Sequence, residues 1–205
     1  MQKMLTQEDK NTILKRELME GTVETVAAIG LENTTTNAIC KTCGVNVAYI
    51  YRFFTDKEDL IAKAFDLVDE RFLTQILDNY TVLNYESIDY ESRCHVLFRK
   101  SWDYLMAHPK DIIFYVRYYY SSSFQEYACA KHMERYRALF EKMKSAFPEN
   151  TDVRLVLHHI LDTLLGEATK QITKPREDND TAATKTFFLI FSVVKNYVKQ
   201  DKFQT

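Results

Sequence analysis

Apolar residues recur along most of the chain at intervals of three and four positions, the spacing of one face of an α-helix. The first such segment spans residues 11–29 and is expected to end at Gly30, a residue suited to a left-handed helix stop. Its apolar side consists of Leu14, Leu18, Val23, Val26 and Ala27. Further helices are expected at about 34–43, 47–53, 55–77, 91–107, 109–120, 124–146, 152–174 and 181–200. The pattern therefore predicts an all-α protein of about nine helices, with a loop at 79–90 and no strand.

Side chains able to cap helices stand at several of these boundaries. Thr34-Thr35-Thr36 precedes the second helix, and Asn46 precedes the third. Thr55 and Glu58 have the spacing of a capping box, which predicts that a long helix opens at Thr55. Pro109 and Pro148 mark a helix start and a helix stop.

Composition narrows the class of protein. The chain has 205 residues, 46% hydrophobic and 27% charged, which excludes a disordered tail or a disulfide miniprotein. Only 4 glycines and 3 prolines are present, too few for the many turns of a β-rich fold. The longest apolar run, 187–194, is far below the ~18 residues of a membrane span. With no apolar leader at the start and four cysteines expected to be reduced, we expect a cytoplasmic protein.

The segment from Thr34 to Leu60 carries the most specific motif. Two short helices joined by a Cys-Gly-Val turn predict a helix-turn-helix, whose second helix enters the major groove of DNA. Gly44 permits a positive backbone dihedral in the turn, and Val45 fills the angle between the helices. The turn continues as Gly-Val-Asn-Val-Ala-Tyr-Ile-Tyr-Arg-Phe-Phe-Thr-Asp-Lys-Glu-Asp-Leu.

These residues resemble the TetR (tetracycline-repressor-like) family of bacterial regulators in unbroken order over about residues 13–65. The resemblance implies a DNA-binding domain at residues 1–58 and an effector-binding and dimerisation domain at residues 59–205. It implies a repressor that a small-molecule effector releases from a palindromic operator, with no cofactor and no catalysis. A homodimer is expected through the last two helices. Residues 153–168 carry an apolar stripe, and the run at 187–194 is apolar on more sides than packing against one core requires.

The resemblance also assigns DNA contacts by position. Tyr51 and Lys57 match residues that lie against phosphates, and Thr35 and Thr36 match capping positions near a phosphate. The positions from which the family reads base edges are occupied by Asn37, Val47, Ala48 and Tyr49. Many relatives begin the recognition helix with Ser-Lys-Gly-Thr, whereas this chain has Asn46-Val-Ala-Tyr49, which removes a cation and adds a ring. Apolar contact from Val47 and Ala48 suits a thymine methyl group.

Aromatic residues are dense over three consecutive helices after Phe98. Either they form a well-packed core or they border a cavity, and the abundance of tyrosine favours a cavity because each buried hydroxyl needs a partner. We expect an aromatic or amphipathic effector there. The expected lining is Trp102, Phe114, Tyr115, Tyr118, Tyr119, Phe124, Tyr127, Met133 and His158.

Other interpretations of the same residues remain open. Cys40 and Cys43 have the spacing of a zinc or redox pair, but they are expected to be small core residues because a second ligand pair is missing. His158 and Asp162 share a helix face and are either a divalent-ion pair or polar interface residues. The competing class is an enzyme or carrier built on a helical bundle, in which the N-terminal motif is only structural. Gly-rich phosphate loops and a Gly-x-Ser-x-Gly motif are missing from the sequence.

Overall fold

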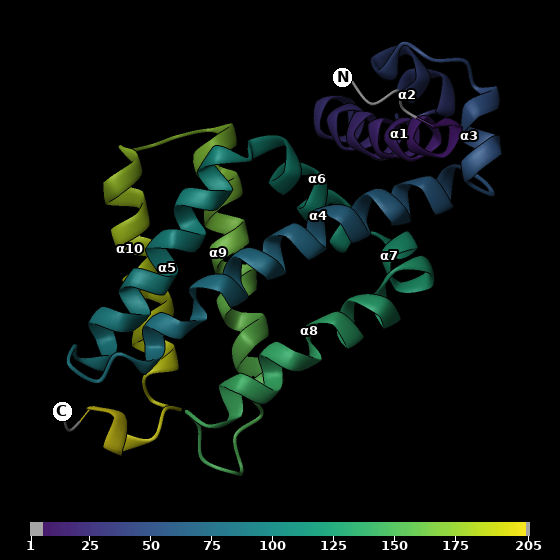
Figure 1. Ribbon diagram of the computed structural model, residues 1–205. Coiled ribbons are helices and arrows are strands. Elements are labelled where there is room, and N and C mark those ends of the chain that lie inside the picture. Colours follow the sequence, from purple (N-terminus) through teal and green to yellow (C-terminus); the bar gives the residue numbers. More distant parts are fainter. Residues whose placement is uncertain (1–5, 204–205) are drawn as a thin grey trace, which may run out of the picture. The chain divides into compact units, whose positions relative to one another are not determined.

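The computed structural model describes residues 6–203, and this part of the chain is helical without a strand. The ten α-helices are α1 (Gln7–Ile29), α2 (Thr36–Cys43), α3 (Ala48–Phe53), α4 (Lys57–Asn79), α5 (Tyr90–Ala107), α6 (Pro109–Tyr119), α7 (Ser122–Tyr127), α8 (Cys129–Lys144), α9 (Val153–Thr173) and α10 (Asn179–Val194) (Figure 1). Two 3-10 helices, η1 (Tyr80–Asn84) and η2 (Gln200–Phe203), complete the described residues. The predicted all-α class is confirmed. No helix of the described chain is both long and apolar enough to span a membrane.

The chain forms two compact units. Unit 1 contains the N-terminal residues as far as Asp69 together with Ile113–His132, and unit 2 contains Glu70–Ile112 and the described residues from Met133 onward. Helices α4, α6 and α8 each contribute residues to both units. The units therefore divide the chain differently from a single cut after residue 58.

In unit 1 the first three helices surround one small core. Its fully or nearly fully buried members are Leu18, Ile39, Cys40, Ile50, Phe54 and Leu60. They come from α1, α2, α3, the α3–α4 turn and α4, so the core joins all the elements of the helix-turn-helix. In unit 2, α5, α9 and α10 pack against one another as long neighbouring helices (Figure 1).

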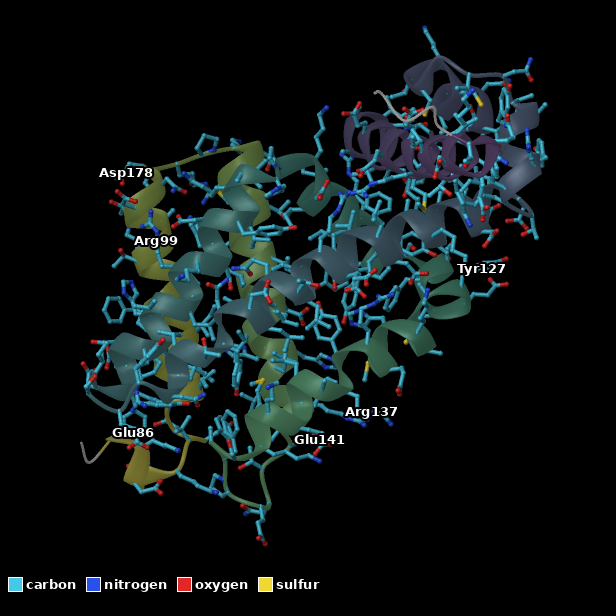
Figure 2. The ribbon with its side chains drawn as sticks, viewed as in Figure 1. Glu86, Arg99, Tyr127, Arg137, Glu141 and Asp178 are labelled. Atoms are coloured by element: carbon cyan, nitrogen blue, oxygen red, sulfur yellow. The ribbon has the colours of Figure 1, made fainter. Side chains whose placement is uncertain are left out.

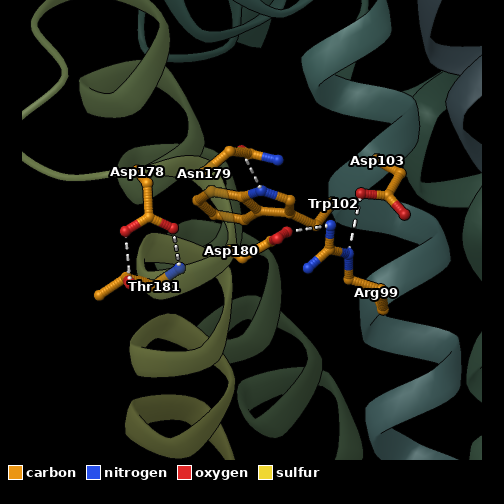
Figure 3. Close-up of polar contacts among 7 residues, drawn as sticks. All are labelled: Arg99, Trp102, Asp103, Asp178, Asn179, Asp180 and Thr181. Carbon is orange, nitrogen blue, oxygen red and sulfur yellow. Dashed lines mark hydrogen bonds and ion pairs between the residues drawn. The ribbon is translucent and has the colours of Figure 1, made fainter.

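A polar cluster fastens the start of α10 to α5 in unit 2 (Figure 3). The indole Nε1 of the buried Trp102 donates to Asn179 Oδ1 over 2.8 Å. Arg99 bonds Asp180 over 2.6 Å and Asp103 over 2.9 Å. Trp102 thus has a structural partner for its only polar atom, which explains how an indole is accommodated in the interior.

Helix boundaries depart from the sequence pattern where polar caps decide them. The first helix starts four residues earlier than expected, because Thr6 and Asp9 form a capping box. The predicted box of Thr55 and Glu58 is wrong by one register: α4 begins at Lys57, Asp56 accepts from the Asp59 amide over 2.8 Å, and the Thr55 amide donates to Asp59. Aspartate serves a cap as well as threonine, so both registers were available.

Three other boundaries differ as well. The helix expected at 124–146 is two helices separated at Ala128, where neither glycine nor proline marks the break. The last long helix ends at Val194 rather than near 200, and the expected loop at 79–90 contains η1. Gly30 has a positive φ of 88° but an extended ψ of 159°, so it ends α1 without the left-handed helical conformation.

Gly21 on α1 lies directly against Cys43 at the end of α2. A β-carbon built at Gly21 would lie 2.1 Å from Cys43 Sγ, far inside contact distance. We expect Gly21→Ala to lower the free energy of unfolding by about 1–3 kcal/mol through overpacking, despite the better helix propensity of alanine. Chemical denaturation followed by circular dichroism measures the change.

The matched test is the same substitution in a Cys43→Ala background, where the sulfur is gone and the next atom, Cys43 Cβ, lies 3.7 Å away. There Gly21→Ala should be neutral or stabilising. Equal costs in the two backgrounds would show that the sulfur contact is not the cause.

Candidate functional site

The helix-turn-helix of unit 1 is built by one cap and one left-handed turn. Thr35 Oγ1 accepts a hydrogen bond from the Ala38 amide over 3.1 Å and starts α2. Gly44 ends α2 with φ 67° and ψ 29°, the left-handed helical conformation that glycine adopts without strain. The Val45 amide then donates to the Cys40 carbonyl over 3.1 Å, which closes the turn. The predicted role of Gly44 is confirmed.

Apolar residues of the turn hold α3 in place. Val45 and Val47 are partly buried and pack against the core around Ile39 and Ile50. Asn46 Oδ1 accepts from the Ala48 amide over 2.9 Å just before α3, but the N-cap position predicted for Asn46 is occupied by Val47, which makes no side-chain cap bond. Because Val47 contributes to this packing, less of its surface is available for a thymine methyl group than the sequence suggests.

The outer side of α3 carries exposed residues that take no part in the core. Tyr51 is 60% exposed, Tyr49 is 39% exposed, and Ala48 is also exposed. On the preceding helix Thr35 and Asn37 are exposed and Thr36 is partly buried. The predicted contact residues of α2 and α3 therefore lie mainly at the surface.

Cations border the same segment. Lys57 is partly buried and lies 3.3 Å from the carboxylate of Glu58, which screens its charge. Two exposed cations were not among the predicted contacts: Lys41 in the last turn of α2, and Arg52, whose guanidinium lies 5.5 Å from the centre of the Phe53 ring. The sequence could have indicated them by their position, since Lys41 lies within the motif and Arg52 directly follows Tyr51.

Four of the predicted effector residues meet in an aromatic cluster of unit 1. Tyr115, Tyr118 and Phe124 lie 4.9 to 5.3 Å from the Phe65 ring, centre to centre, and Phe114 stacks on Tyr118 at 6.2 Å. All of them are 0–2% exposed. Burial raises the pKa of the Tyr118 hydroxyl, which keeps it protonated.

A buried carboxylate adjoins this cluster. Asp69 on α4 is fully buried, and it accepts from the Tyr115 hydroxyl over 3.2 Å. His132 Nδ1 lies 3.1 Å from both oxygens of the same carboxylate. Tyr119 is partly buried, with its ring 5.6 Å from that of His132. Side chains from α4, α6 and α8 thus share one polar centre inside unit 1.

The other predicted effector residues lie apart from the aromatic cluster. Tyr127 is 46% exposed on α7 and extends into solvent (Figure 2). Trp102 on α5 is buried in unit 2, where it bonds Asn179 at the start of α10. Met133 and His158 are partly buried residues of the same unit. No cluster of three or more potential metal ligands occurs in residues 6–203, and the His158–Asp162 pair is not extended by a third.

Unit 2 contains an apolar cavity of about 150 Å³ that the sequence pattern does not indicate. It is lined by Ile76, Tyr80, Leu83, Tyr90, Cys94, Leu97, Phe98, Ser101, Leu139, Met143, Ala146, Phe147, Leu157, Ile160, Leu161, Leu164, Phe187, Ile190, Phe191, Val194 and Val198. Several of these belong to the two stripes assigned to a dimer interface. None of the nine predicted effector residues lines it.

The few polar groups of the cavity wall are uncharged at neutral pH. Burial raises the pKa of the Tyr80 hydroxyl to about 12 and that of the Cys94 thiol to about 12, and it raises the pKa of Tyr90 as well. The Ser101 hydroxyl is already bonded to the Leu97 carbonyl over 3.1 Å. A cavity with this apolar lining favours hydrocarbon, and one of this size accommodates a molecule like benzene.

Together these features define a helix-turn-helix protein with an apolar cavity in its second unit. Residues 18–64 match the family model described as bacterial regulatory proteins, tetR family. The predicted resemblance to the TetR family is thereby confirmed for the N-terminal segment that carries the motif. No curated protein matches the chain significantly.

Solved structures share the fold over nearly the whole chain. A TetR family transcription regulator from Marinobacter aquaeolei VT8 has a TM-score of 0.73 at 16% identity, covering 96% of this chain and 100% of its own. FadR from Bacillus subtilis, solved in complex with stearoyl-CoA, has a TM-score of 0.64 at 19% identity, covering 86% of this chain and 97% of its own. FadR from Bacillus halodurans has a TM-score of 0.64 at 22% identity, covering 86% of this chain and 93% of its own. At these identities the likeness shows the fold.

The cavity makes a direct prediction. Ala146 lines it, so Ala146→Leu should fill part of the space and raise the free energy of unfolding by about 0.5–2 kcal/mol. The same change should weaken binding of a small apolar fluorescent dye. Denaturation curves and dye titration measure the two effects.

Ala138→Leu is the matched control, because Ala138 is exposed on α8 and does not line the cavity. It should change neither quantity appreciably. Unaltered dye binding in Ala146→Leu would place the dye elsewhere.

Proposed function

We propose that the protein is a ligand-responsive DNA-binding regulator of transcription, acting as a repressor that an effector releases from a palindromic operator. The observation that carries this proposal is the helix-turn-helix within the TetR-family match at residues 18–64, with exposed tyrosines on its second helix. Tyr49 and Tyr51 take no part in the core of the motif and are available for contact with DNA. The alternative class is therefore not favoured.

DNA recognition is divided between two kinds of contact. Tyr51, Lys57, Thr35 and Thr36 serve as phosphate contacts, which position the protein without reading sequence. Asn37, Asn46, Ala48 and Tyr49, with what remains accessible of Val47, face the base edges of the major groove. The exposure of most of these residues supports the assignment.

The first DNA prediction concerns these two classes. Lys57→Ala should weaken binding to all sequences alike and reduce the salt slope by about one, since one phosphate contact is lost. Asn37→Ala or Tyr49→Ala should instead change the preference between operator variants, by about 1–3 kcal/mol for each good base contact. Fluorescence anisotropy with fragments selected from genomic DNA measures both.

Lys142→Ala is the control, an exposed lysine on α8. If Lys57→Ala behaves like this control in affinity and salt slope, Lys57 makes no phosphate contact. If the full-length protein selects no fragment above the non-specific background, the proposed function itself is wrong.

A homodimer through α9 and α10 is part of the proposal, and it would use only those residues of the two expected apolar segments that the subunit leaves exposed. Val156, Leu157, Leu164 and Phe191 are 3–6% exposed and pack inside their own subunit. The apolar residues left at the surface are Leu155 (66% exposed) on α9 and Phe188 (55%), Leu189 (52%) and Val193 (39%) on α10. A second copy that covers these residues would remove them from water.

The dimer prediction follows from that exposure. Phe188→Glu should raise the dimer dissociation constant at least about 100-fold, because a two-fold axis brings both new charges into one apolar contact. Sedimentation or light scattering measures the association. Tyr85→Glu, at a position 58% exposed between η1 and α5, should leave it unchanged. A Phe188→Glu protein that remains dimeric would exclude this face.

The effector site is proposed to be the apolar cavity of unit 2. The stearoyl-CoA complex of FadR supports an apolar effector, because a protein of the same fold accommodates a long acyl group. Helices α4 and α8 line the cavity in unit 2 and continue into unit 1, so they provide covalent paths from the cavity to the unit that carries the helix-turn-helix. On α6, Arg117 donates to the carbonyls of Val26 and Ala27 and caps the C-terminus of α1.

The effector acts in this proposal by population shift, favouring a conformation of the dimer that no longer fits the operator. The alternative effector site is the aromatic cluster of unit 1, which includes Phe114, together with the adjoining Tyr119. If the effector no longer releases DNA from the Ala146→Leu protein, the cavity is the effector site. If release is lost only in Tyr119→Ala, the aromatic cluster is the effector site.

A further inference from the structure

Phenylalanine rings of α5 and α10 form a continuous part of the wall of the unit 2 cavity. Phe98, Phe187 and Phe191 line the cavity and are 4–8% exposed. The Phe187 ring lies 5.6 Å from that of Phe98 and stacks on that of Phe191 at 5.3 Å, centre to centre. The Trp102 indole, which does not line the cavity, stacks on Phe98 at 6.0 Å. These packed rings offer a further ring the offset and edge contacts that aromatic pairs prefer.

The rest of the lining carries no charge, and most of its polar groups already have a partner. Among the described residues that line the cavity, none is an acid, a lysine, an arginine or a histidine. The Tyr90 hydroxyl and the Cys94 thiol bond each other, and burial raises the pKa of both groups, so they stay protonated. The Ser101 hydroxyl bonds the Leu97 carbonyl. A charged ligand placed here would lose its hydration and gain no partner of opposite charge.

The volume of the cavity limits the size of the ligand. At about 150 Å³ it equals an apolar cavity of leucine, isoleucine and phenylalanine side chains that binds benzene. A stearoyl group has many more carbon atoms than benzene and exceeds this space. The apolar lining alone would suit either molecule, so it is the volume that selects the smaller one.

We propose that the cavity binds a small uncharged molecule with one aromatic ring and at most a short alkyl substituent, such as toluene. The inference rests on the proposed function in taking this cavity as the effector site, and it adds the chemical class of the effector. Burial of the ring among apolar side chains drives binding, and the phenylalanine rings favour it over a saturated ring of similar size. A carboxylate or an ammonium group on the same ring opposes binding, because the lining offers it no counter-charge.

The experiment compares ligands that each differ from toluene in one property. Toluene, methylcyclohexane, benzoate, benzylamine and stearoyl-CoA are titrated into the full-length protein at pH 7 by isothermal calorimetry. We expect toluene to bind about two- to tenfold more tightly than methylcyclohexane, the range that an aromatic pair adds to area burial. Benzoate and benzylamine should bind at least about 100-fold more weakly than toluene, because each buries an unpaired charge. Stearoyl-CoA should not bind.

Two substitutions, each with a control, test the location of the ligand. Ala146→Leu fills part of the cavity and should weaken toluene binding at least about tenfold, whereas Ala138→Leu at an exposed position should not change it. Phe187→Leu removes one ring of the wall and should lower the preference for toluene over methylcyclohexane. Phe188→Leu, at the adjacent exposed phenylalanine, should keep that preference. If Phe187→Leu does not fold, the Ala146 variant and the ligand series in the wild type decide the question.

The proposal is overturned if benzoate, methylcyclohexane or stearoyl-CoA binds as tightly as toluene, or if Ala146→Leu leaves toluene binding unchanged. A DNA-release assay separates this result from the proposed function. Toluene that binds in the cavity without releasing DNA supports the site and contradicts the effector role. Release by stearoyl-CoA and not by toluene supports a ligand-responsive regulator and contradicts the small aromatic effector.

Discussion

The full burial of the Asp69 carboxylate constrains the central helices of unit 1. A carboxylate removed from water is costly unless it is hydrogen-bonded, and here Tyr115 and His132 surround it. These partners come from α6 and α8, so three helices must meet at one point. The same three helices continue into unit 2, where α4 contributes to the apolar cavity through Ile76 and α8 through Leu139 and Met143. The three helices that the two units share therefore all contribute to the same polar centre, the one around Asp69.

Much of the helix-turn-helix could be predicted because its signals are local. Gly44 and Thr35 determine backbone geometry within a few residues of themselves, and each has the predicted role. Prolines act equally locally, since Pro109 starts α6. The predicted cap of α4 is wrong by one residue because both Asp56 and Thr55 have side chains that can cap a helix, and the spacing of Thr55 and Glu58 favours the wrong one.

The cavity could not be predicted for a different reason. Periodicity shows that one face of a helix is apolar but not what covers that face, so Leu157 and Leu164 were assigned to a dimer contact although they line the cavity. The tyrosines of α6 are the opposite case, because they were expected to border a cavity and are instead packed. Tyr115 and Tyr118 lie against Phe65, and the Tyr115 hydroxyl donates to Asp69. The break at Ala128 has no sequence marker at all.

An apolar wall also determines how finely such a protein discriminates among related molecules. One methylene in a hydrophobic pocket changes binding by only about 1–3 kcal/mol, so neighbouring chain lengths are ranked gradually rather than accepted or refused. The cavity of unit 2 offers almost no directional contact beyond the region of Tyr80 and Tyr90. A sensor with this lining would respond to the combined concentration of a homologous series. Its output would then follow the supply of a whole pool of compounds and not the level of a single metabolite.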